Sequence, residues 1–130
     1  MRYGFVLSDY WTALVSDDPV AIRAFFHPNA LVYWHNTNEC FTVDEFISVN
    51  VAYPHTWSVD IEYQLNVGEW NEDLIISATR VYSEEGGRSF HCCSAFKLHD
   101  GKIISLDEYW GDDGRPPEWR RRMHIGQPIK

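Results

Sequence analysis

The stretch RSFHCCSAFKLHDGKIISLDEYW, residues 88–110, decides the fold. Both of its halves carry apolar and aromatic residues, and Asp100 and Gly101 between them are typical turn residues. We therefore predict two antiparallel strands joined by a tight turn. Because successive side chains of a strand point to opposite faces, only one of the neighbouring acids Asp107 and Glu108 can face the protein interior.

The length of the turn decides which acid that is. A two-residue turn places Asp107 on the face of Phe96, whereas a three-residue turn with a bulge at Gly101 pairs Phe96 with Ile104 and places Glu108 there. The second register collects the apolar side chains on one face, so we choose it. Its inward set is Phe90, Phe96, Leu98, Ile104, Leu106 and Trp110.

The preceding segments indicate helices first and strands afterwards. Helical spacing predicts a helix over residues 4–15 and a second that begins at Pro19 and ends at Pro28. Residues 29–36 indicate a strand, residues 37–41 a loop, and Thr42 caps a third helix. Two further strands are predicted at 57–70 and 73–83. In the strand at 57–70, one buried face is expected to hold Val59, Ile61, Tyr63, Leu65 and Val67.

This order is α-α-β-α-β-β-β-β, followed by a short C-terminal helix that a proline begins. It predicts an α+β fold in which the helices cover one face of an antiparallel sheet. At 130 residues, the chain is expected to form one domain, 1–130, with a single core.

The charge is unevenly distributed. The net charge is −8, but residues 1–114 hold 6 Lys and Arg against 18 Asp and Glu, whereas residues 115–130 hold 5 against 1. The acidic body is expected to repel nucleic acid, so we expect the basic tail to lie across its own body or a sister subunit. No apolar run is long enough to span a membrane, and the start lacks the pattern of a signal peptide. The odd set Cys40, Cys92 and Cys93 favours a reduced, cytoplasmic protein.

Glu108 is the leading candidate for a catalytic residue. Burial among apolar side chains raises the pKa of a carboxyl group, and a raised pKa suits an acid or base that works near neutral pH. The alternative is a structural ion pair with Arg80 across Cys92, which the chosen register places opposite Glu108. That pair forms only if the loop SEEGG, residues 83–87, closes so that Arg80 faces inward, and the sequence leaves both closures open.

The order of elements, FFHPNALVYW at 25–34 and DGKIISLDEYWGDDG at 100–114 resemble the nuclear transport factor 2-like superfamily. The likeness is to its SnoaL-like branch, which includes polyketide cyclase-like and ketosteroid isomerase-like proteins. WHNTNE at 34–39 and IGQPIK at 125–130 resemble a bacterial group of that branch with no assigned activity. The resemblance implies a cone-shaped, cystatin-like roll in which a curved sheet wraps around the N-terminal helices. It also implies a cavity between them and a homodimer formed through the outer sheet face.

The resemblance implies site positions as well. Tyr10 matches the oxyanion-hole tyrosine on the first helix of the isomerases. Trp34 replaces their general-base aspartate, however, and Ser94 replaces their protonated aspartate, so ketosteroid isomerase chemistry is not expected. The pocket positions of the last strand match Leu106, Glu108 and Trp110.

Strand alternation and the loop after residue 34 add further candidates. Together, the expected pocket-lining residues are Trp34, Asn36, Glu39, Arg80, Cys92, Ser94, Phe96, Leu106 and Trp110. The six histidines have no metal-ligand spacing, and the sequence has no phosphate-binding glycine loop, nucleophile elbow or paired-cysteine motif. We therefore expect neither a metal nor a cofactor.

Two functions are compatible with these residues. The first is an aromatic-lined cavity for a hydrophobic small molecule, with cofactor-independent isomerisation, dehydration or cyclisation. There Glu108 would move a proton and Tyr10 would donate a hydrogen bond to a carbonyl oxygen. The second is a non-catalytic binding or dimerisation module in which Glu108 only pairs with Arg80.

Overall fold

The computed structural model describes residues 4–69 and 72–130. The helices are α1 (Leu7–Ser16), α2 (Pro19–Arg23), α3 (Val43–Ala52) and α4 (Glu118–Arg121). The strands are β1 (Phe26–Trp34), β2 (Glu39–Thr42), β3 (Ser58–Glu69), β4 (Glu72–Ser83), β5 (Arg88–His99) and β6 (Lys102–Asp112). This arrangement confirms the predicted α+β class. The end of the strand predicted at 57–70 lies outside the described residues.

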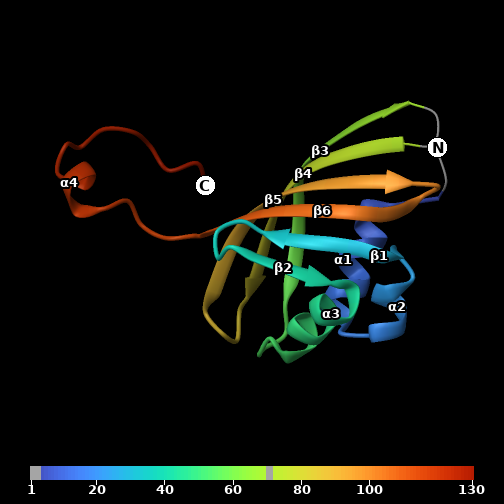
Figure 1. Ribbon diagram of the computed structural model, residues 1–130. Coiled ribbons are helices and arrows are strands. Elements are labelled where there is room, and N and C mark those ends of the chain that lie inside the picture. The colour runs from blue at the N-terminus through green and yellow to red at the C-terminus, as the bar shows by residue number, and fades with distance from the viewer. Residues whose placement is uncertain (1–3, 70–71) are drawn as a thin grey trace.

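The strands form one curved sheet in the order β2-β1-β6-β5-β4-β3. All neighbours are antiparallel except β1 and β6, which run parallel. Helices α1, α2 and α3 lie together on one side of this sheet, as Figure 1 shows. The core between helices and sheet is mainly apolar and aromatic, and Tyr10, Ile22, Val32, Phe96, Ile103 and Leu106 are fully buried in it.

The N-terminal half differs from the prediction at two places. Helix α2 ends at Arg23, and β1 begins at Phe26, so that His27 and Pro28 belong to a strand. The pairing of β1 with β6 is irregular between Phe26 and Leu31, and an irregular stretch is where a strand tolerates a proline that cannot donate a hydrogen bond. The short strand β2 begins inside the loop predicted at 37–41 and ends at Thr42.

The Asp100–Gly101 turn corrects the predicted hairpin register. His99 pairs with Lys102 across a two-residue turn, but a bulge between Lys97 and Leu98 restores the alternation expected for Glu108. The extra residue is Ile104, which is 38% exposed, whereas Ile103 is fully buried. Glu108 therefore points inward as predicted, for a different reason. It lies opposite Ser94, and Cys92 lies opposite Trp110.

A second bulge overturns the predicted face of β3. The register with β4 shifts between Ile61 and Tyr63. A bulge adds one residue to β3 without a partner on β4, so every later side chain of β3 points to the opposite face from the one that simple alternation predicts. Val59 and Ile61 lie opposite Val81 and buried Thr79, on the inner face. The three residues that were predicted to share this buried face point outward instead and are exposed: Tyr63 (76%), Leu65 (60%) and Val67 (52%).

The basic tail leaves the sheet after β6 and projects from the body, as Figure 1 shows. Trp119 of α4 is 62% exposed, and the Arg120 guanidinium lies over its ring. The tail returns far enough for the Lys130 amine to lie 3.7 Å from a carboxylate oxygen of Glu62 on β3. Within the described residues, no helix is long and apolar enough to cross a membrane.

Candidate functional site

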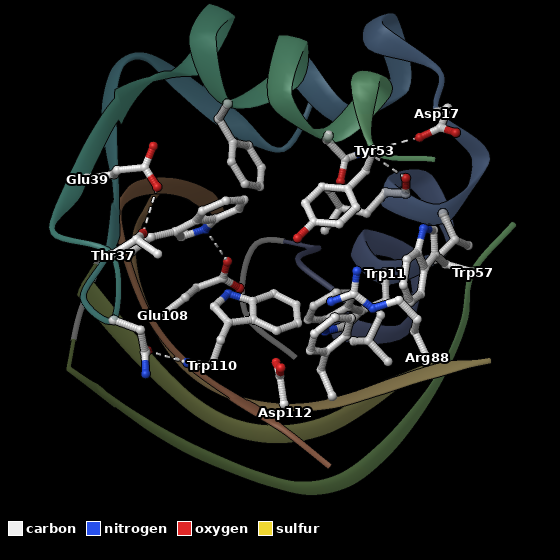
Figure 2. A pocket seen from close by; sticks show the side chains of 18 residues that line it. Trp11, Asp17, Thr37, Glu39, Tyr53, Trp57, Arg88, Glu108, Trp110 and Asp112 are labelled. Carbon is white, nitrogen blue, oxygen red and sulfur yellow. Dashed lines mark hydrogen bonds between the residues drawn. The ribbon is translucent and has the colours of Figure 1, made fainter. Parts of the chain in front are cut away.

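A cavity of about 510 Å³ opens between the helices and the inner face of the sheet (Figure 2). Seven of the eighteen residues that line it are aromatic, and carboxylates and one arginine lie among them. The lining residues are Trp11, Leu14, Val15, Asp17, Trp34, Asn36, Thr37, Glu39, Phe46, Asn50, Tyr53, Trp57, Val81, Arg88, Phe90, Glu108, Trp110 and Asp112.

Glu108 lies on this wall, yet its side chain is only 1% exposed. Its Oε1 accepts a hydrogen bond from Trp34 Nε1 at 3.0 Å, and its Oε2 accepts one from Ser94 Oγ at 3.0 Å. Cys92 Sγ lies 3.7 Å from Oε2 as a weaker donor. Strands β1, β5 and β6 therefore hold the carboxyl group from three directions, because Trp34 and Ser94 are the register partners of Glu108 on its two neighbours.

Burial raises the pKa of Glu108 above its ordinary value of 4.5, although hydrogen bonds from Ser94, Trp34 and Cys92 oppose the shift. The Trp110 indole, which is close to the carboxyl group, also lowers this pKa. Burial and the neighbouring Glu108 carboxyl raise the pKa of the Cys92 thiol as well, so this cysteine stays protonated and is a poor nucleophile.

Arg80 does not reach Glu108. In the loop between β4 and β5, Ser83 pairs with Arg88, which places Arg80 opposite His91 on the outer face. There the Arg80 guanidinium donates to Ser89 Oγ, lies 3.8 Å from Asp60 and stacks over Tyr82. The expectation that Arg80 lines the pocket is therefore wrong. Within the described residues, no basic side chain forms an ion pair with Glu108.

Tyr10 lies in the core behind the cavity rather than on its wall. Its ring contacts Phe96 edge-on, at 5.2 Å between ring centres. Burial, Glu108 and Cys92 raise the pKa of its hydroxyl, and this buried hydroxyl has no hydrogen-bond partner among the described residues. The expected hydrogen bond from Tyr10 to a substrate in the cavity does not follow from this placement.

The other expected pocket residues divide into two groups. Trp34, Asn36, Glu39 and Trp110 line the cavity together with Glu108. Asn36 accepts a hydrogen bond from the backbone N–H of Trp110 at 2.6 Å, which joins the loop after β1 to β6. The second group, Cys92, Ser94, Phe96 and Leu106, is buried behind the wall and supports it.

A comparison of the sequence with protein-family models and with curated proteins found no match. Solved structures, in contrast, share its architecture. A candidate ketosteroid isomerase from Kribbella flavida has a TM-score of 0.74 at 15% identity, with 95% of this chain and 87% of that chain covered. A protein of unknown function from Burkholderia xenovorans, described as nuclear transport factor 2-like, has a TM-score of 0.68 at 18% identity, with coverage of 94% and 91%.

A third structure is that of a protein with a ketosteroid isomerase-like fold from Catenulispora acidiphila, in complex with trimethylamine. Its TM-score is 0.62 at 14% identity, and the match covers 79% of this chain and 82% of that one. The chain has the nuclear transport factor 2-like fold. At these identities the likeness establishes the architecture, while the chemistry of the site has to come from its own residues.

Sequence reasoning missed several residues on the wall of this cavity. Tyr53 and Trp57 come from the segment after α3, Arg88 and Phe90 from the start of β5, and Asp112 from the end of β6. The sequence shows that three of them are aromatic, but their place on the wall depends on how the segment after α3 and the β4–β5 loop fold toward each other. Among residues 4–69 and 72–130, no group of three or more His, Cys, Asp or Glu side chains is arranged to hold a metal ion.

Proposed function

We propose that the cavity binds a hydrophobic small molecule and that Glu108 moves a proton on it, in an isomerisation, dehydration or cyclisation. One observation carries this proposal. Glu108 is a buried carboxyl group on the wall of an aromatic cavity, held by neutral hydrogen-bond donors and by no cation within the described residues. This environment raises its pKa toward the range of a working acid or base.

The two oxygens of Glu108 have different partners. The Trp34 indole can only donate, so Oε1 has to remain an acceptor. The Ser94 hydroxyl can donate or accept, so Oε2 can lose or gain a proton and keep its hydrogen bond to Ser94. We therefore assign the proton transfer to Oε2, with Ser94 following the protonation state.

The aromatic lining of the cavity supports an apolar ligand. Trp34 and Trp110 lie beside Glu108 and contact each other edge-on, with ring centres 6.3 Å apart and an angle of 67° between the ring planes. Two structures with this fold are described as a candidate ketosteroid isomerase and as a complex with trimethylamine, which favours a small-molecule site in this chain too. The fold alone does not choose the reaction.

The rival hypothesis is a binding module without catalysis. It loses its structural argument for Glu108, because Arg80 pairs on the outer face instead. It remains distinct in its consequences, since a binder would retain its ligand equally well with or without a titratable group at residue 108.

Deuterium incorporation separates the two hypotheses. A panel of cyclic ketones and unsaturated ketones is incubated with the protein in D₂O, and exchange next to the carbonyl group is followed by NMR. We expect exchange with the wild-type protein and a loss of about 10²- to 10⁴-fold in Glu108→Gln. The matched control is Asp107→Asn, because Asp107 points outward and contacts His35 at 2.7 Å. Ligand binding without exchange in any member of the panel would favour the binding module.

We further propose a homodimer through the outer sheet face. Exposed Tyr63, Leu65 and Val67 form an apolar strip on β3, which a second copy would cover. Sedimentation equilibrium of the wild-type protein and of Leu65→Lys tests it, and a wild-type monomer would refute it. The three cysteines are free in the structure, and a cytoplasmic location remains part of the proposal.

A further inference from the structure

The aromatic residues of the cavity wall form a continuous belt. Each ring contacts the next, with ring centres between 5.7 and 6.3 Å apart, and four of the five contacts are edge-on. Rings that meet edge-on do not share a plane, so the belt presents ring faces in several directions around the cavity. In order, the members of this aromatic belt are Phe46, Trp34, Trp110, Phe90, Trp57 and Tyr53.

The aromatic belt already holds a cation of the chain itself. The guanidinium of Arg88 lies over the ring of Phe90, 4.9 Å from its centre, although Arg88 is free to extend into solvent (Figure 2). The face of an aromatic ring carries partial negative charge and attracts a cation placed over it. Within the described residues, Arg88 forms no ion pair with a carboxylate. The belt is therefore a surface on which positive charge is stabilised by rings.

Three exposed carboxylates, those of Asp17, Glu39 and Asp112, also line the cavity. Asp17 accepts a hydrogen bond from the Asn50 amide at 3.2 Å, and Glu39 accepts one from the Thr37 hydroxyl at 2.6 Å. Both donors are neutral. In the part of the chain that the structure describes, none of the three carboxylates has a basic side chain within 4.0 Å.

Acids outside the cavity are treated differently. Several of them lie beside basic side chains, as in the pairs Arg23 with Asp44, Arg80 with Asp60, Arg122 with Glu118 and Lys130 with Glu62. The negative charge that lines the cavity thus exceeds the positive charge of Arg88 and is left for a bound molecule to neutralise.

We propose that the ligand of the cavity is a hydrophobic cation, an apolar molecule that carries a positively charged nitrogen, such as a quaternary or protonated tertiary amine. This inference rests on the proposed function, because it takes the cavity as the site of a small molecule, and it adds the chemical class of that molecule.

The rings and the carboxylates together select this class. A neutral apolar molecule would use the aromatic belt but leave the carboxylates without a counter-charge, and an anion would be repelled by them. A small, strongly hydrated cation would gain little from the rings. A nitrogen covered by alkyl groups combines positive charge with apolar surface, and such groups are bound by aromatic cages in proteins.

Two probes of equal shape test the inference. Phenyltrimethylammonium is a cation, and tert-butylbenzene has carbon in place of the charged nitrogen. Ligand-observed NMR titrations give the dissociation constant of each probe, and the ratio of the neutral to the cationic value measures the preference for charge. We expect this ratio to fall about two- to fivefold in Asp112→Asn and in Trp57→Leu.

Each variant has a matched control. Asp107→Asn removes the same charge from β6, but from the outer face, where Asp107 contacts His35. Trp119→Leu removes a tryptophan of the tail that is 62% exposed and does not line the cavity. Both controls should keep the wild-type ratio. An equal ratio in all five proteins would overturn the inference.

A measurement on the wild-type protein avoids any instability of the variants. Methyl groups held over ring faces are shielded, so the N-methyl proton signal of phenyltrimethylammonium should move to lower frequency as the bound fraction rises. Raising the NaCl concentration from about 0.05 to 0.5 M should weaken this cation and leave tert-butylbenzene unchanged, because salt screens exposed carboxylates.

The remaining outcomes separate this inference from the proposed function. Binding of the cation with an unmoved N-methyl signal would place it away from the aromatic belt and overturn the inference. Binding of tert-butylbenzene alone would also overturn it, but would leave the proposed function standing. Failure of both probes to bind the wild-type protein would contradict the proposed function and, with it, this inference.

Discussion

Glu108→Gln should change how the stability of the protein depends on pH. The folded pKa of Glu108 is raised by burial, so between the unfolded value near 4.5 and the folded value the folded state binds a proton that the unfolded state has released. The stability that this proton provides is complete below the unfolded pKa. It is lost as the pH rises toward the folded pKa.

The size of the effect follows from one proton. While only the folded state holds it, the free energy of unfolding falls by about 1.4 kcal/mol for each pH unit. In Glu108→Gln this contribution to the pH dependence of the free energy of unfolding is absent, because glutamine does not titrate. Its carbonyl oxygen can accept from Trp34 and its amide can donate to Ser94, so the two proteins should agree within about 1 kcal/mol at low pH. The variant should then become the more stable protein as the pH rises.

Urea unfolding at a series of pH values from 4 to 9 measures the difference directly, with tryptophan fluorescence as the signal. Every other titrating group contributes to both proteins and cancels in their difference. Asp107→Asn removes a charge from the outer side of the same strand and controls for that loss. Parallel stability curves for wild type and Glu108→Gln would refute the reasoning, because they would mean that Glu108 titrates alike in the folded and unfolded states.

Three further predictions concern other parts of the molecule. Phe96→Ala, which empties a fully buried site beside Tyr10, should cost about 3–5 kcal/mol in urea unfolding. Arg80→Met should cost less than about 1 kcal/mol and leave the pH dependence due to Glu108 unchanged, because Arg80 lies on the outer face. The hydrogen bond to Asp113 raises the pKa of His91, with Glu62 adding to the effect. Asp113→Asn should therefore lower the His91 pKa in an NMR titration, and an unchanged value would show that this hydrogen bond does not form.

The orientation of Glu108 was predictable because the hairpin contains enough apolar residues to define one buried face. Its register was not, since Ile103 and Ile104 are equally apolar neighbours and the sequence does not show which of them a bulge will expel. The same limit applies to β3, where the bulge beside Ile61 turns a regular alternation outward. Apolar alternation identifies a strand, but the bulges that decide its faces depend on the partner strand.

The site was harder to predict than the fold because its residues depend on loops. The face on which Arg80 lies depends on how the loop at residues 83–87 joins β4 to β5, and the sequence is compatible with either loop geometry. Tyr53 and Trp57 reach the cavity through the path of the segment after α3, where no periodicity applies. Trp34, in contrast, lies at the end of a strand whose alternation the sequence shows, and it is among the residues that line the cavity.

The hydrogen bond from Trp34 to Glu108 joins residues 74 positions apart, through two strands that run parallel. Parallel neighbours cannot be joined by a local turn, so β1 and β6 come from distant parts of the chain. Neither half of the chain can assemble the candidate site alone. An ordered carboxyl at position 108 therefore requires β1, β5 and β6 to be in place together, so a loss of the β1–β6 pairing alone would release this side chain from its indole donor.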